Sequence, residues 1–213
     1  MELKNLNILN VFKTKTFNEK SLALLVLTLL PAMFVTKSFE ATVIYAVLYV
    51  IFIIITSMLS KLVRLISEGE LRKIYLLLTY VTVAILLSQF VSAFYIPFGK
   101  SEFLLYIYLF PVTALPYLID ADNEAKNIGR TLVDGLQSVL VLVAVLLVTA
   151  FFRELIGTGG INFTRYFGGG FKFDLFSKYS VAAFTSNYFT LIILGFYTAI
   201  VQFCFNRKME VTK

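Results

Sequence analysis

A small set of ionisable side chains is placed where it could act in a buried site. The six residues are Asp120, Asp122, Glu124, Asp134, Arg153 and Glu154. The three acidic residues between positions 120 and 124 follow the charge-free segment 103–119, whereas Asp134 precedes and Arg153 and Glu154 follow the charge-free segment 135–152. Burying an ionisable group at membrane depth costs free energy, so such groups are candidates for an ion pathway or for an interface between subunits.

Each of these residues also has an ordinary structural interpretation, and the sequence leaves both open. Asp134 lies about one turn inside the fifth predicted span, if that span begins at Thr131, and its carboxylate would there meet the positive end of the helix dipole. Arg153 and Glu154 would form an interfacial pair that ends the same span. The acidic residues between positions 120 and 124 would form a solvated loop.

The supply of nucleophiles and metal ligands excludes several kinds of site. The chain has no histidine and one cysteine, Cys204. A serine–histidine–aspartate triad, a zinc site of cysteine and histidine, and a four-thiolate iron–sulfur site from this chain alone are therefore impossible. Cys204 is interpreted as a small apolar residue near the end of the last hydrophobic segment. We predict no catalytic residue and no metal site in this chain.

The composition indicates an integral membrane protein that is built from helices. Of 213 residues, 59% are hydrophobic and only 15% are charged, whereas about a quarter of an ordinary soluble chain is charged. Six segments lack charged residues, and a membrane-spanning helix needs about 20 apolar residues. The segments are Ser21–Thr36, Ala41–Ser60, Ile74–Gly99, Phe103–Ile119, Gly135–Phe152 and Tyr179–Asn206.

The two shortest segments occupy equivalent places, because each opens a set of three. Pro31 interrupts the first of them, and Pro111 and Pro116 interrupt the fourth. Short, proline-broken segments in corresponding positions are typical of transporters with inverted repeats. Two ordinary kinked helices would give the same pattern. We therefore expect an all-α membrane protein with six transmembrane helices in two inverted three-helix repeats, with the first and fourth helices broken.

The basic residues predict the topology. The net charge is +6, which in a soluble protein would suggest nucleic acid, but here the charges lie between apolar segments. With the N-terminus inside, thirteen of the 19 Lys and Arg residues fall in cytoplasmic segments. The positive-inside rule therefore places both termini in the cytoplasm. The other six are Lys37, Lys100, Arg153, Arg165, Lys172 and Lys178.

These features divide the chain into four parts. Residues 1–20 form a cytoplasmic N-terminal segment, and residues 21–99 form the first three-helix repeat. Residues 100–206 form the second repeat, with an outer loop at 157–178, and residues 207–213 form a cytoplasmic tail. The N-terminal segment resembles a signal sequence only superficially, so we expect an uncleaved first span.

Four stretches resemble the Rnf/Nqr membrane subunits. The most specific is Asp134–Gly160, DGLQSVLVLVAVLLVTAFFRELIGTGG, which is similar to the fifth span of that family. The first, third and fourth spans of that family are similar to Leu27–Thr36, Gly69–Val83 and Phe110–Asn127, respectively. The resemblance covers about residues 20–160 and fits the RnfE/NqrD branch better than its inverted partner, RnfA/NqrE.

The resemblance implies an integral subunit, without a catalytic centre of its own, of a redox-driven complex in the bacterial or archaeal cytoplasmic (inner) membrane. Such translocases pass electrons between NADH and ferredoxin or quinone and move Na⁺ or H⁺. The implied partners are an inverted homologous six-span subunit, further Rnf/Nqr-like subunits and the lipid bilayer. Nucleic acid is not among them.

The sequence departs from the family at the iron–sulfur cluster. The resemblance places the two cluster-ligand cysteines of the family at Leu30 and Tyr117, and neither residue is a normal iron ligand. We therefore expect no cofactor bound by this chain alone, with an iron–sulfur cluster and flavins in partner subunits. Two alternatives stay open: a transporter component or scaffold without a cluster, and a six-span solute-binding subunit of a vitamin importer.

Overall fold

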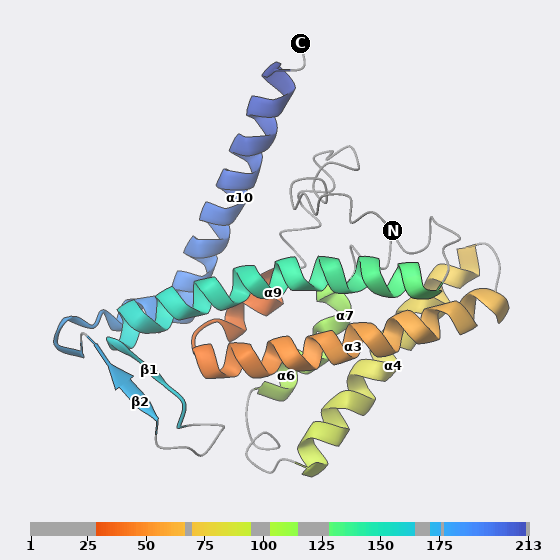
Figure 1. Ribbon diagram of the computed structural model, residues 1–213, viewed down its shortest axis with the longest axis horizontal. Helices are drawn as coiled ribbons and strands as arrows, with labels where there is room; N and C mark the ends of the chain where they lie inside the picture. Colours follow the sequence, from red (N-terminus) through yellow and green to blue (C-terminus); the bar gives the residue numbers. More distant parts are fainter. Residues whose placement is uncertain are drawn as a thin grey trace, which may run out of the picture.

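The computed structural model describes residues 29–66, 70–94, 103–114, 128–164, 171–175 and 177–211 (Figure 1). Four long helices dominate this part of the chain: α3 (Phe39–Ile66), α4 (Glu70–Phe94), α9 (Ile128–Thr158) and α10 (Asn187–Val211). Residues 29–35 are also helical and lead through a turn into α3. The expected all-α architecture is therefore confirmed in its main features.

Three helices are long and apolar enough to cross a membrane, over Phe39–Val63, Leu71–Ala93 and Val139–Thr158. A shorter apolar helix covers Asn187–Ile200 within α10. Charge-free segments predicted these helices, but α3 continues past its segment through Lys61, because a charged side chain at a helix end can reach the membrane surface. Six spans stay a prediction, because half of the first segment and the last five residues of the fourth lie outside the described residues.

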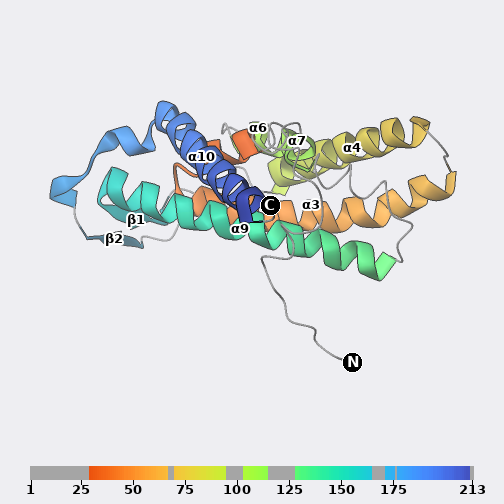
Figure 2. The ribbon, with the colours of Figure 1, turned by 90° about the horizontal axis from the view of Figure 1, so that it is seen from above.

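Helices α3 and α9 run antiparallel, side by side, in both ribbon views (Figures 1 and 2). Each is the second helix of its predicted repeat. An antiparallel pair of equivalent helices is the arrangement expected when one repeat is inverted relative to the other. Helix α4 packs against α3, while α10 begins near the end of α9 and then leaves the pair.

The fourth segment is broken, as its prolines predict. It forms α6 (Phe103–Tyr108) and α7 (Phe110–Thr113), separated by a turn at Leu109. Pro111 lies in the first turn of α7, where its missing N–H costs no helical hydrogen bond. Inside a continuous helix the same ring would clash with the preceding turn, so the helix restarts instead.

Aromatic rings fill the core where α3, α4 and α7 meet. The Phe110 ring centroid lies 5.0 Å from that of Tyr45, 5.2 Å from Tyr49 and 5.3 Å from Phe52. The Tyr80 ring of α4 meets Phe52 at 5.7 Å. All five side chains are almost fully buried. The short helix α7 is therefore held by one phenylalanine that is inserted among the tyrosines of α3.

A small hairpin interrupts the helical pattern after α9. Strands β1 (Gly160–Asn162) and β2 (Lys172–Asp174) pair antiparallel, with Ile161 opposite Phe173. Two 3₁₀ turns follow, η1 (Ser177–Tyr179) and η2 (Ala182–Thr185), and lead into α10. The sequence predicts only a loop at 157–178. Strands of three residues are too short to show an alternating pattern.

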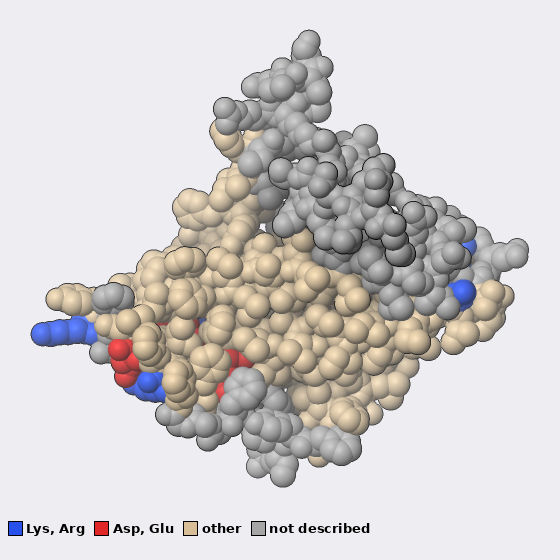
Figure 3. Space-filling view, in the orientation of Figure 1, with Lys and Arg blue, Asp and Glu red and all other residues tan. Residues whose placement is uncertain are grey.

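The surface separates charge from apolar area along the helix pair. Figure 3 shows charged side chains at the two ends of the α3–α9 pair, with an uncharged surface between them. Less than half of each membrane-span window is buried within the chain. The remaining surface of the spans is therefore available to lipid or to other subunits.

Candidate functional site: a buried arginine–glutamate junction

Arg153 binds the chain at two places far from it in the sequence. Its Nη1 donates to the carbonyl of Met33 at 3.3 Å and to Thr36 Oγ1 at 2.7 Å. Its Nε donates to the carbonyl of Phe184, and its Nη2 to that of Ser186, both at 3.0 Å. The side chain is 2% exposed. Arg153 thus connects the end of the first helical segment to the turn that precedes α10.

The local structure explains why oxygens face the guanidinium. Helical residues 29–35 end at Thr36, and the last carbonyls of a helix lack an internal partner and carry partial negative charge. The Thr36 hydroxyl donates to the Met33 carbonyl at 2.7 Å and leaves its lone pair for Arg153. On the other side, η2 ends at Thr185, which presents the carbonyls of Phe184 and Ser186.

All four oxygens that Arg153 binds are uncharged. The buried charge is therefore stabilised only as long as these oxygens stay within hydrogen-bond distance. A buried cation without hydrogen bonds is strongly destabilising. A planar guanidinium offers five N–H donors in a fixed fork, so it can satisfy acceptors on two sides at once. The two segments must therefore hold their positions for the charge to stay buried.

Glu154 joins a different pair of elements. Its Oε2 accepts a hydrogen bond from the backbone N–H of Phe39, the first residue of α3. Its Oε1 accepts from the N–H of Asn162 in β1 at 3.1 Å. A carboxylate at a helix N-terminus pairs with unsatisfied N–H groups and with the positive end of the dipole. Glu154 therefore fixes the start of α3 and the hairpin to the end of α9.

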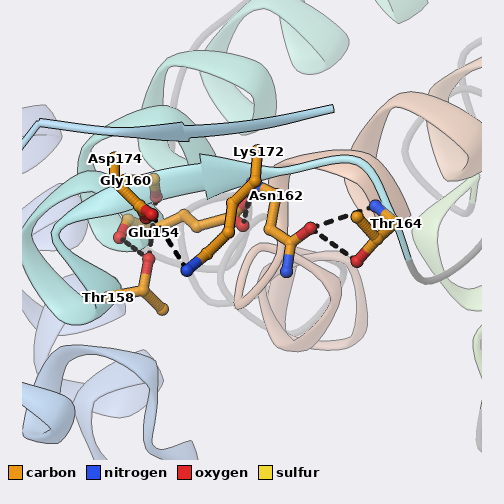
Figure 4. Close-up of polar contacts among 7 residues, drawn as sticks. All are labelled: Glu154, Thr158, Gly160, Asn162, Thr164, Lys172 and Asp174. Atoms are coloured by element: carbon orange, nitrogen blue, oxygen red, sulfur yellow. Dashed lines mark hydrogen bonds and ion pairs between the residues drawn. The ribbon is translucent and has the colours of Figure 1, made fainter. Parts of the chain in front are cut away.

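A glycine turn aligns the hairpin with Glu154. Gly159 has φ 76°, a left-handed conformation that closes α9 without strain only for glycine. A Cβ on Gly160 would lie 2.3 Å from the carbonyl oxygen of Phe173 on the opposite strand. Thr158 Oγ1 lies 2.7 Å from the Gly160 carbonyl and 2.8 Å from that of Glu154 (Figure 4). The turn and the hairpin are therefore one tightly packed unit.

The junction borders a groove between α9 and α10. It is lined by Arg153 and by apolar residues that include Phe152 and Phe189. Thr149 Oγ1 and Tyr197 Oη lie 2.7 Å apart and form the hydrogen bond that links the two helices there. The groove is almost wholly apolar, so the polar groups of the junction are turned towards the protein and not into the groove.

The structure treats the predicted site residues differently. Arg153 and Glu154 come to one junction, although they bind different elements, and α9 continues beyond them to Thr158. Asp134 lies in α9, six residues after its first residue Ile128. It is beyond the first turn, where the helix dipole acts most strongly. Leu30 packs against the core.

Four predicted positions, Tyr117 and the acidic residues Asp120, Asp122 and Glu124, lie outside the described residues. Among the described residues, no three or more Asp, Glu, Cys or His side chains form a group that could hold a metal ion. The predictions for the acidic cluster and for the cofactor therefore stay predictions.

Sequence reasoning missed the partners of the two charged residues. Thr36 and Ser186 carry no recognisable motif, and three of the acceptors of Arg153 are backbone carbonyls that every residue possesses. Glu40 was also missed; it is fully buried in the first turn of α3. The sequence could have indicated that Glu40 lies at a helix start, because it precedes a long apolar segment and acidic residues favour the first turn of a helix.

Comparison with known proteins identifies the family. The family model described as Rnf-Nqr subunit, membrane protein, matches residues 8–203. No individual curated protein is a significant match. The family match includes the predicted spans, the junction at Arg153 and Glu154, and most of α10. The chain therefore belongs to the Rnf-Nqr family of membrane-protein subunits.

Proposed function

We propose that this chain is an integral subunit of an Rnf/Nqr-like complex that couples electron transfer to translocation of Na⁺ or H⁺. The family match over residues 8–203 carries the proposal. The three apolar helices and their exposed lateral surfaces support a place within a membrane assembly. The chain contributes a rigid scaffold and subunit contacts, while redox centres reside in its partners.

The partner we propose is an inverted homologous six-span subunit, which makes this chain the RnfE/NqrD-like member of the pair. Two features support this arrangement. An antiparallel α3–α9 pair is the arrangement that inverted repeats within one chain would give. In addition, a helix broken within a membrane exposes backbone groups that only neighbouring protein can satisfy, and α6 and α7 form such a break at Leu109.

The residues at the family's cluster position do not fit an iron–sulfur centre. Leu30 is a hydrocarbon side chain packed against the core, so it offers no donor atom. The one cysteine of the chain, Cys204, lies in α10 and cannot replace two thiolates. We propose that this subunit supplies no cluster ligand and that electrons pass through groups held by other subunits. The same misfit is the observation that favours a second candidate, a scaffold or transporter component released from redox work.

Affinity purification of the tagged full-length chain from its native membrane tests the proposed complex. We expect co-purification of a six-span homologue and of a subunit with covalently bound flavin. Recovery with transporter subunits that hydrolyse ATP would overturn the proposal, and would support the vitamin-importer alternative. Recovery with the homologue but without any redox subunit would overturn the electron-transfer role and support the scaffold.

Ion transport by inverted membrane vesicles tests the coupling. NADH-driven uptake of ²²Na⁺ or of protons should be lost when the chain is deleted, and should return when the chain is supplied again. A Cys204→Ala chain should restore uptake fully and leave the acid-labile sulfide of the complex unchanged, because this chain supplies no thiolate. Loss of sulfide on that substitution would overturn the proposed absence of a cluster ligand.

A further inference from the structure

A continuous strip of phenylalanine rings leads from the end of α9 to the hairpin. The centroids of Phe152 and Phe151 lie 5.6 Å apart, and Phe151 lies 6.1 Å from Phe39 at the start of α3. Phe39 meets Phe163 after β1 at 5.8 Å, and Phe163 meets Phe171 before β2 at 6.2 Å. We call these five residues the phenylalanine strip. Its two ends are open: Phe152 is 55% exposed and Phe171 64%.

The register of the hairpin separates apolar from polar side chains. Ile161 pairs with Phe173, and the N–H of Phe163 donates to the Phe171 carbonyl at 3.0 Å, so the next pair continues outward. Because directly opposite and alternate residues share one face of a sheet, all four apolar side chains lie on the same face. We call it the apolar face.

The opposite face of the hairpin carries polar residues. Asn162 pairs with Lys172, and Gly160 pairs with Asp174. Lys172 Nζ and Asp174 Oδ2 form an ion pair at 2.9 Å, and both side chains are largely exposed (Figure 4). A two-stranded hairpin is only marginally stable by itself in water. Its amphipathic design therefore needs a medium that accepts an apolar face on one side and charge on the other.

The membrane–water interface is such a medium, and the hairpin lies next to the end of an apolar helix. The apolar stretch Val139–Thr158, long enough to span a membrane, ends two residues before Gly160, and two residues of chain reach at most about 7 Å. With this stretch in the hydrocarbon core, the hairpin begins within the interfacial layer, which adds roughly 5–8 Å on each side of that core. The phenylalanine strip continues the exposed apolar surface of α9, beginning at Phe152, onto the apolar face.

We propose that the hairpin is an interfacial anchor whose occupant is the lipid bilayer. Ile161, Phe163, Phe171 and Phe173 lie against the boundary between acyl chains and headgroups, while Lys172 and Asp174 face the headgroups and water. Because Glu154 binds the N–H of Asn162, the anchor holds the end of α9 and the start of α3 at a fixed depth. This inference goes beyond the proposed redox function and requires only that the chain spans a membrane.

The chain contains no tryptophan, so the difference in fluorescence between a variant complex and the wild-type complex reports on the one tryptophan that was introduced. Phe173→Trp places the reporter on the apolar face, and Lys172→Trp, one residue away, is the matched control on the polar face. Each full-length variant is purified with its native partners and reconstituted into phosphatidylcholine vesicles. Fluorescence is then quenched either by acrylamide in water or by lipids brominated near the top of the acyl chain.

We expect brominated lipid to quench the reporter of Phe173→Trp, and acrylamide to quench it at least about twofold less than that of Lys172→Trp. Equal quenching of the two by acrylamide would overturn the anchor. Protection of the reporter of Phe173→Trp from both quenchers would also overturn it, because a protein partner would then cover the face. Phe171→Trp is a second reporter on the same face and must give the same pattern as Phe173→Trp.

Discussion

At the scale of single residues, the junction depends on two neighbouring side chains of opposite charge, and each of them binds other groups instead of its neighbour. Arg153 binds four uncharged oxygens, and Glu154 binds two backbone N–H groups. Consecutive residues on a helix point about 100° apart, so one position of α9 can serve two sets of neighbours. The charges are used as strong hydrogen-bonding groups and not as an ion pair.

Replacing Arg153 should therefore destabilise the fold more than removing an exposed charge would. Arg153→Met keeps the length of the side chain but leaves the carbonyls of Phe184 and Ser186 without this donor. We expect a loss of about 2–4 kcal/mol, measured as a lower midpoint of thermal unfolding in detergent. Lys178→Met, at an exposed position in η1, is the matched control. Equal midpoints for the two variants would contradict the role of Arg153.

The acceptors of Glu154 predict an order of stability among its variants. Glu154→Gln retains one carbonyl oxygen but turns an amide N–H towards the second backbone N–H. We expect it to cost about 1–3 kcal/mol, and Glu154→Ala to cost more, because both N–H groups then lose their acceptor. Asp174→Asn, on the exposed face of the hairpin, should unfold close to the wild type. A Glu154→Gln protein as stable as the wild type would refute this prediction.

Sequence reasoning found these two residues but could not find what they bind. The element from Arg153 to Gly160 contains the charged pair and the glycine turn, all of which the structure uses. Their partners are backbone groups, and Met33 lies 120 residues from Arg153. A backbone carbonyl has the same chemistry in every residue, so no pattern in a single sequence can distinguish those that will meet a guanidinium.

At the scale of elements, the apolar segments predicted the long helices because hydrophobic length is the main requirement for a membrane span. Pro111 predicted the break between α6 and α7 for an equally local reason. The hairpin and the two 3₁₀ turns were not predicted. Their stability comes from contacts with other elements, such as the hydrogen bonds of Asn162 and Gly160 with α9, and not from local propensity.

The close approach at Gly160 makes the hairpin sensitive to one methyl group. In Gly160→Ala the new Cβ would meet the carbonyl of Phe173 at 2.3 Å and the Cα of Asp174 at 2.9 Å. The two strands must then separate, so we expect faster hydrogen exchange across residues 160–174. In the matched control, Gly195→Ala in α10, the Cβ meets nothing within 4 Å. Unchanged exchange in Gly160→Ala would show that the strands do not approach this closely.

At the scale of the whole molecule, α3 and α9 begin and end at opposite surfaces, so an assignment of one loop orients the chain. The excess of Lys and Arg in the segments assigned to the cytoplasm predicts that the hairpin lies outside. The structure adds that the starting end of α3, the final end of α9 and the hairpin share one end of the molecule, because Glu154 joins all three.

Cysteine labelling measures this orientation. In a Cys204→Ser background, Thr164→Cys is an exposed position beside the hairpin, and Lys61→Cys is an exposed position towards the other end of α3. A membrane-impermeant thiol reagent should modify Thr164→Cys in intact cells and Lys61→Cys only in inside-out vesicles. The reverse pattern would invert the topology and remove the argument for the RnfE/NqrD-like member of the pair.

The hydrogen bonds of Arg153 also form in a fixed order during synthesis, because their acceptors lie on both sides of Arg153 in the sequence. Met33 and Thr36 enter the membrane long before Arg153 does, whereas Phe184 and Ser186 follow it by 31 and 33 residues. A nascent chain inserted from its N-terminus therefore carries an incompletely bound guanidinium until the turn before α10 leaves the ribosome. The turn before α10 is therefore the last part of the site to form, because it supplies the carbonyls of Phe184 and Ser186. A chain that stops before this turn lacks two of the four oxygens that Arg153 binds.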